Sequence, residues 1–221
     1  MTARTITRAA FLATLMGAAT LAVATPAFAA RNADAEQYIQ TNASSAMRTL
    51  ADRSIPAATR EQAFNRLMSE FTDMPRIASF VLGVHGRQLR SDAALRAEWN
   101  RVFQEYATAV YEDQLDRYRG STIRVTGSVE RVPGRDIIVA SEIVPRSGRA
   151  IPAQWRLLRT GDTWKVVDVS LLLEGNEIWL AQQQQRDFLA VLDRNNGDIR
   201  GLIVEVNAMI TRMRARATAR G

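Results

Sequence analysis

The sequence has no cysteine, only one histidine (His85) and only one lysine (Lys165) among its 221 residues. Without cysteine there is no disulfide, thiolate metal ligand or cysteine nucleophile. A lone histidine argues against a histidine-based metal site. A Ser-His-Asp triad would have to use His85, which stands in a predicted loop, and no Gly-x-Ser-x-Gly motif occurs. The composition therefore disfavours metal-dependent and nucleophilic enzymes, and we expect no metal, no cofactor and no enzymatic activity.

After residue 30 there is no apolar run of the ~20 residues that a transmembrane helix needs. A shorter apolar run, residues 9–23, follows Arg4 and Arg8 and precedes the small residues Ala27-Phe28-Ala29. This order is typical of a secretory signal peptide. We predict a signal peptide over residues 1–29, cleaved after Ala29 or Ala30, with an uncleaved membrane anchor as the alternative. Export from the cytoplasm would separate the mature chain from ATP, NAD and nucleic acid.

The basic residues are nearly all arginine. Lys and Arg together number 29 against 23 Asp and Glu, and loss of Arg4 and Arg8 with the signal peptide leaves 27. This mild positive charge could favour binding to anionic lipid headgroups or to acidic partner surfaces. Alternatively, the arginines could simply be solvated at the surface. Residues 30–221 suffice for a single domain with a full core. We expect its arginine-rich tail, about 214–221, to be disordered.

The apolar periodicity changes along the chain from helix to strand and back to helix. Helical spacing predicts helices over about 34–50, 54–71, 73–82, 92–118, 177–192 and 198–210. Alternation with period two predicts strands over 123–129, 137–143, 151–157 and 164–168, joined by short turns. The expected fold class is α+β, with a curved four-stranded antiparallel sheet wrapped by helices.

The interior of such a fold is either a solid core or a pocket. Asp168 follows Trp164 and Val166 in the last predicted strand, and it could be a buried general base or a hydrogen-bonded structural group. Arg156 and Arg159 could meet a phosphate at a pocket mouth or could be solvated. No convergent catalytic set accompanies these residues.

Three segments resemble the MlaC/toluene-tolerance family of periplasmic lipid-binding proteins. The first is the stretch from Phe71 to Gly83, which contains Phe-Thr-Asp, Ile-Ala and Val-Leu-Gly. The second is Trp155-Arg156-Leu157 followed by Trp164-Lys165-Val166-Val167-Asp168-Val169. The third is Glu174-Gly175, followed by Gln185-Arg186-Asp187-Phe188 and Asp198-Ile199. Gly86-Arg87 stands where the family usually has Trp-Arg, and Ile178-Trp179-Leu180-Ala181 is closer to a hopanoid-associated branch.

The resemblance implies an NTF2-like cone with an apolar interior that holds acyl chains. It implies a monomeric periplasmic shuttle that carries phospholipid between an outer-membrane lipoprotein complex and an inner-membrane ABC transporter, and so maintains outer-membrane lipid asymmetry. A hopanoid or another polycyclic lipid is the alternative cargo, and an NTF2-like enzyme using Asp168 is the alternative function.

On this reading the pocket is lined by apolar side chains from the helices, the sheet and the closing helix. The predicted lining residues are Phe80, Trp99, Phe103, Tyr106, Val125, Val139, Trp155, Leu157, Val166, Trp179 and Phe188.

Overall fold

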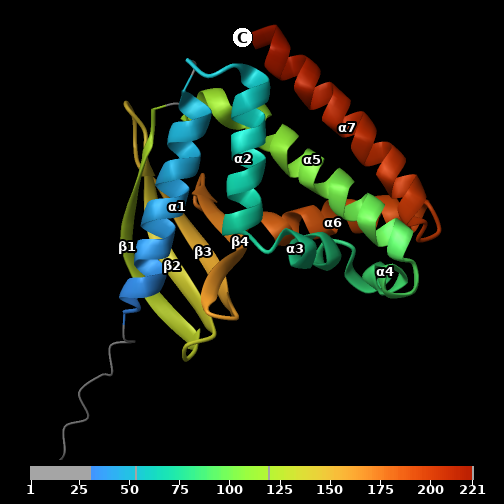
Figure 1. Cartoon of the computed structure of the whole chain (residues 1–221), viewed down its shortest axis with the longest axis horizontal. Coiled ribbons are helices and arrows are strands. Elements are labelled where there is room, and N and C mark those ends of the chain that lie inside the picture. The colour runs from blue at the N-terminus through green and yellow to red at the C-terminus, as the bar shows by residue number, and fades with distance from the viewer. Residues whose placement is uncertain (1–30, 53, 119, 221) are drawn as a thin grey trace, which may run out of the picture.

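The computed structural model describes residues 31–220 except 53 and 119, so the predicted signal peptide lies outside the described residues. The elements follow the order helices, sheet, helices (Figure 1). The helices before the sheet are α1 (Ala33–Ala51), α2 (Ala57–Phe71), α3 (Met74–Phe80), the 3₁₀ helix η1 (Gly83–Arg87), α4 (Gln88–Ser91) and α5 (Ala93–Tyr118). The strands are β1 (Thr122–Val132), β2 (Asp136–Val144), β3 (Ile151–Thr160), β4 (Thr163–Leu173) and β5 (Asn176–Trp179), and α6 (Leu180–Arg194) and α7 (Ile199–Arg220) follow.

The sheet is an antiparallel meander in the order β1-β2-β3-β4-β5. The expected α+β class is confirmed, whereas the expected count of four strands is wrong by one. Residues 176–179, expected as a strand-to-helix approach and the first turn of a helix, form β5 and pair with β4. The reason is a tight turn, since Glu174 and Gly175 both have positive φ (52° and 81°) and fold the chain back on itself. Helix α6 therefore begins at Leu180.

Helices α1 and α2 lie beside the sheet, while α5 and α7 form a second layer that slants away from it (Figure 1). Side-chain caps fix where several helices begin. Asn32 accepts a hydrogen bond from the Ala35 N–H, Asp73 from Arg76 and Asp92 from Leu95. The two layers are joined at the α2–α3 junction, where the Asp73 N–H donates to the Val166 carbonyl of β4 at 3.0 Å.

The segment expected to be a disordered tail, about 214–221, lies in α7 as far as Arg220. Two of its arginines are held by acidic residues of other helices. Arg214 lies 3.0 Å from Glu61 of α2, and Arg216 lies 2.9 Å from Asp113 of α5. None of the helices in the described part of the chain is long and apolar enough to cross a membrane.

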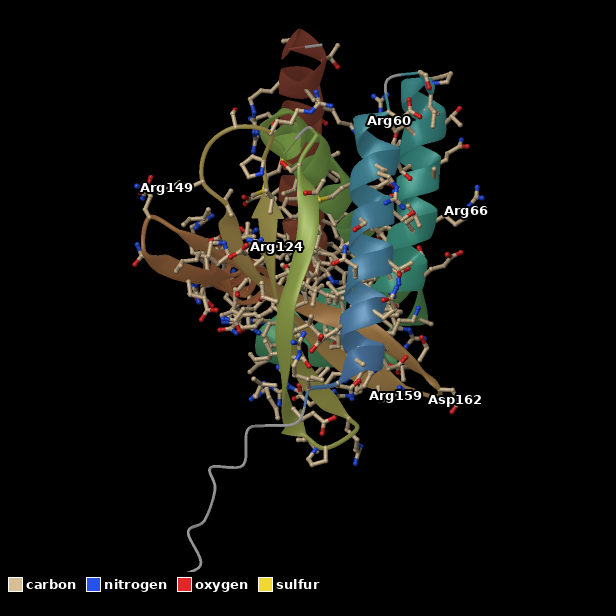
Figure 2. The ribbon with its side chains drawn as sticks, turned by 90° about the vertical axis from the view of Figure 1, so that its left-hand side faces the viewer. Arg60, Arg66, Arg124, Arg149, Arg159 and Asp162 are labelled. Carbon is tan, nitrogen blue, oxygen red and sulfur yellow. The ribbon has the colours of Figure 1, made fainter. Side chains whose placement is uncertain are left out.

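Positive charge is spread over the surface seen in Figure 2. Arg66 on α2 and Arg149 before β3 point away from the body on opposite sides, and Arg124 lies on β1 between them. Arg124 pairs with Glu142, and Arg159 lies 3.1 Å from Asp34. The labelled arginines thus favour the interpretation of a solvated surface over that of one basic patch.

Candidate functional site

The interior contains two main apolar clusters. The helical cluster is built by α3, α4, α5, α6 and α7 around Trp99, Phe103 and Phe188. The sheet cluster lies between α1 and the inner face of the sheet, around Ile39, Val139 and Leu157. This division follows from the topology, because α5 and α7 pack mainly against each other and α1 packs on β1 and β2.

Aromatic contacts order the helical cluster. The Phe188 ring meets Trp99, Phe103 and Tyr106 edge-on, with centroid distances of 5.7, 6.4 and 5.5 Å. The Trp99 Nε1–H donates to the Ala78 carbonyl at 2.7 Å, so this buried ring has its polar atom satisfied. Tyr106 is half-buried, and its hydroxyl accepts a hydrogen bond from Gln184 at 2.7 Å. Burial raises the pKa of Tyr106, which stays a neutral phenol.

The sheet cluster has its own aromatic contacts. Phe71, at the end of α2, lies between Tyr38 of α1 and Trp155 of β3, with centroid distances of 5.6 and 5.9 Å. The Trp155 Nε1–H donates to Ser141 Oγ at 2.8 Å. Burial raises the pKa of Tyr38 to about 12. Phe71 thereby fixes α2 against the inner face of the sheet.

The predicted lining residues are divided between these two clusters rather than gathered around one space. Trp99, Phe103 and Phe188 are packed inside the helical cluster, with Tyr106 at its edge. Val139, Leu157 and Val166 are packed inside the sheet cluster, with Val125 and Trp155 at its edge. Phe80 is 44% exposed at the end of α3. Trp179, half-buried at the end of β5, belongs to neither cluster.

Each cluster has an edge of half-buried apolar side chains. We call the first set the sheet rim, consisting of Val125, Ile151, Trp155, Val169 and Leu171. We call the second set the helix rim, consisting of Tyr106, Ala107, Val110 and Met209. These residues pack against a core on one side and keep surface uncovered on the other, which is the condition for an apolar ligand to gain contact. Only Tyr106, Val125 and Trp155 of these were predicted from the sequence.

A β-bulge explains why part of the sheet rim was missed. Leu157 pairs with Val166 and Arg156 pairs with Asp168, so Val167 is an extra residue in β4. Beyond the bulge the inward positions are Val169, opposite Trp155, and Leu171, opposite Ala153. Simple alternation from Trp164 and Val166 would instead have put Asp168 on the inner face. The bulge turns Asp168 to the face that carries Arg156.

Comparison with known proteins identifies the fold. The model of the family described as MlaC protein matches residues 39–208, which run from α1 into α7 and include every strand. The chain belongs to the MlaC protein family. The family resemblance of the three sequence segments is thereby confirmed.

A solved structure has the same fold as this MlaC-family chain. It is a phospholipid-binding protein from Ralstonia solanacearum, determined in complex with a phospholipid. The TM-score is 0.69 at 18% sequence identity, over 81% of this chain and 98% of the other. At that identity the likeness shows the fold alone. A search of the curated proteins found no significant match.

The MlaC-family chain uses Asp168 to fasten the start of α6. One carboxylate oxygen accepts hydrogen bonds from the Val169 and Ala181 backbone N–H groups, both at 2.8 Å. Burial raises the pKa of Asp168, while these two N–H groups and the charge of Arg156 act in the opposite direction. The β4–β5 pairing ends at Ser170 and Trp179, and the Asp168 carboxylate accepts the hydrogen bond of the Ala181 N–H just beyond it. This structural role explains why an acidic residue stands at this position and needs no catalytic role.

Two substitutions of Asp168 should separate the contribution of its charge to stability from that of its hydrogen bonds. Asp168→Asn still offers an oxygen to Ala181, so we expect it to melt at neutral pH no lower than the parent chain. Asp168→Ala leaves two backbone donors unpaired and should lose about 1–3 kcal/mol of stability. Equal damage from both substitutions would contradict this assignment. So would loss of a catalytic turnover in Asp168→Asn, which the rival enzyme hypothesis expects.

The raised pKa also predicts a pH dependence. The folded chain binds the Asp168 proton more tightly than the unfolded chain, whose ordinary carboxyl value is 3.8. The contribution of this group to the free energy of unfolding is therefore greatest below that value and falls as pH rises through the raised pKa. Asp168→Asn should abolish this component. Thermal melts of both chains from about pH 3 to about pH 7 would measure the difference.

The described part of the chain contains no cluster of three His, Cys, Asp or Glu side chains suited to a metal ion. His85, predicted in a loop, lies in η1, and its ring packs against Gly197 of the α6–α7 turn. A Cβ on Gly197 would lie 2.7 Å from that ring, so only glycine fits there. The contact gives His85 a packing role between two connecting segments.

Proposed function

We propose that this chain binds a phospholipid noncovalently and carries it through the periplasm. Its exchange partners would be an outer-membrane lipoprotein complex and an inner-membrane ABC transporter. Membership of the MlaC family supports this proposal. The fold it shares with a protein solved with a phospholipid is consistent with it.

The observation that carries the proposal is the pair of half-buried rims. The sheet rim lies on the α1-covered face, opposite to that of the exposed Leu172, and ends at Leu171. The helix rim lies on α5 and α7, around Val110 and Met209. An acyl chain that covers such side chains removes apolar area from water, worth about 25 cal/mol per Å². The rims therefore offer apolar contact from both layers of the fold.

A lipid carrier must shield acyl chains from water, and the two apolar rims are suited to that task. Each exposed methylene of an acyl chain costs about 0.8 kcal/mol in water, so a two-chain lipid does not cross the periplasm unaided. A carrier needs apolar cover and no covalent chemistry. One oxygen of Asp168, the carboxylate that suggested catalysis, accepts hydrogen bonds from the backbone N–H groups of Val169 and Ala181.

Protein purified from the periplasm without detergent is expected to carry phospholipid. Native mass spectrometry should show an added mass of one phospholipid, and solvent extraction should identify the headgroup and chains. Recovery of a polycyclic lipid would replace the ligand class and keep the carrier role. Recovery of lipid-free protein that takes up no phospholipid from vesicles would contradict the proposal.

The proposed compartment rests on the N-terminal sequence alone. Export should remove the signal peptide, so N-terminal sequencing of protein from the periplasmic fraction should begin at Ala30 or Arg31. Retention of Met1 in a membrane fraction would favour the anchor alternative.

A further inference from the structure

The segment that joins α3 to α4 exposes two large apolar side chains. Phe80, at the end of α3, is 44% exposed, and Val84 of η1 is 65% exposed. Phe80 was predicted to line the pocket, but it lies at the surface instead. Figure 1 shows α4 at a corner of the helical layer, away from the sheet. Gln88 of α4 donates there to the Gly197 carbonyl of the α6–α7 turn at 3.0 Å.

Buried neighbours hold this segment in place. Val81 and Leu82, which precede η1, are fully buried in the helical cluster. A Cβ on Gly86 would lie 2.9 Å from the Ser79 carbonyl oxygen, so η1 folds closely back on α3. The two exposed apolar side chains are therefore presented to solvent by a packed backbone. Exposed apolar groups that lie near each other and are bordered by polar residues are typical of contact sites.

The charge around these side chains has one sign. Between Asp73 and Asp92 the sequence contains arginines and no acidic residue. Arg87 donates through Nε to a carbonyl of η1 at 3.1 Å, and Arg96 of α5 donates to a carbonyl of α4 at 3.0 Å. Arg90 belongs to α4 itself, and all three arginines are exposed.

These three arginines have no carboxylate within 4.0 Å in the described part of the chain, whereas the flanking Asp73 and Asp92 are paired with other arginines. The segment thus combines uncompensated positive charge with exposed apolar surface. We call the set the basic corner, consisting of Phe80, Val84, Arg87, Arg90 and Arg96.

We propose that the basic corner docks the protein on an anionic phospholipid surface. An arginine close to a negative lipid surface strengthens binding about fivefold, and apolar side chains that enter the headgroup region add to this. An acidic protein is the less favoured occupant, because a stable protein interface covers about 800 Å² on each side with matching shape. A lipid surface adapts to a small corner. The basic corner shares no residue with the two rims, so this docking does not depend on the cargo.

Sedimentation with vesicles tests the proposal. Parent protein is mixed with vesicles that contain phosphatidylglycerol, or with vesicles of phosphatidylcholine alone, and the bound fraction is measured after centrifugation. Protein that has only extracted a lipid stays in the supernatant, so the pellet reports docking. The parent chain should bind the anionic vesicles and not the neutral ones, and the binding should weaken as salt is added.

Two double variants lose the same charge at different places. Arg87→Gln with Arg90→Gln should lower binding to the anionic vesicles about 25-fold, fivefold for each arginine. Arg66→Gln with Arg149→Gln removes two exposed arginines from other parts of the surface, where both point away from the body (Figure 2). This second double variant should bind like the parent chain.

The apolar part of the basic corner has its own matched pair. Val84→Asp should lower binding to the anionic vesicles about tenfold, through lost apolar contact and added negative charge. Val204→Asp makes the same change at a position on α7 that is 69% exposed, and it should bind like the parent chain. Circular dichroism should show both variants folded, because neither side chain is part of the core.

Each outcome decides the proposal. A parent chain that sediments with neither vesicle would overturn it and favour an acidic protein as the occupant, and equal binding to both vesicles would also overturn it. Equal losses in the two double variants would show that net charge, and not the basic corner, draws the protein to lipid. Both double variants should still be recovered with cargo. Loss of cargo from Arg87→Gln with Arg90→Gln would assign the corner to the cargo site and overturn its docking role, whereas a parent chain that docks without ever carrying lipid would overturn only the proposed function.

Discussion

Protein stripped of lipid is expected to melt about 5–10 °C below the loaded protein. A ligand that binds only the folded chain stabilises it by RT ln(1 + [L]/Kd), which is about 2.7 kcal/mol at a hundredfold excess over Kd. For a domain of this size each kcal/mol shifts the melting temperature by about 2–4 °C. Scanning calorimetry of loaded, stripped and reloaded samples would measure the shift, and reloading should restore it.

A solid interior predicts a different result. If the two apolar clusters closed on each other without space for cargo, no folded-state site would exist and the three samples would melt together. That outcome would leave a structural domain without cargo as the better description. The comparison requires equal protein concentration and removal of free lipid, since the shift depends on free ligand.

The same linkage constrains how the cargo is released. A lipid that shifts the melting temperature by several degrees is held tightly. Its dissociation into water is also unfavourable because its acyl chains become exposed to water. We therefore expect hand-off to need contact with a membrane complex that favours the emptied state of the carrier. Such a partner acts only through different affinities for the loaded and empty forms.

Much of the fold could be predicted because local chemistry agrees with the tertiary structure. Helices were expected from about residues 73 and 92, and α3 and α5 begin directly after Asp73 and Asp92, whose carboxylates accept backbone hydrogen bonds from the first turn. Alternating burial in β2 follows its apolar alternation from Ile137 to Ile143. The family resemblance required several motifs in order, and that order reflects a shared fold.

Other features could not be predicted, because periodicity carries no information about irregular backbone. The extra residue at Val167 reverses which side chains of β4 face inward, and nothing in its aliphatic run marks the bulge. The positive φ of Glu174 is unusual for a residue other than glycine, so the β4–β5 hairpin was read as a strand leading into a helix. Burial patterns also do not say which of two clusters a residue joins, which is why Trp99 and Val139 were placed together.

Three glutamate substitutions should distinguish core, rim and outer surface. Val139 is 0% exposed beneath α1, so Val139→Glu places a charge where no partner can reach it. An unpaired buried charge costs about 3–5 kcal/mol, a large part of a total stability of about 5–15 kcal/mol. We expect this variant to be largely unfolded, and any loss of lipid from it would report unfolding. Circular dichroism and thermal melting would measure the loss of structure.

Leu171→Glu should separate lipid binding from folding. Leu171 is half-buried on the sheet rim, so a carboxylate there can still reach water in the empty protein. A bound acyl chain would cover this carboxylate and remove it from water, which is unfavourable. We expect this variant to fold, to melt near stripped parent protein and to carry no lipid. Its neighbour Leu172 is 42% exposed on the opposite face of β4, so Leu172→Glu is the matched control and should keep its lipid. Full lipid occupancy in Leu171→Glu would show that the sheet rim is not where the acyl chains lie, because the same charge at Leu172 leaves the sheet rim unchanged.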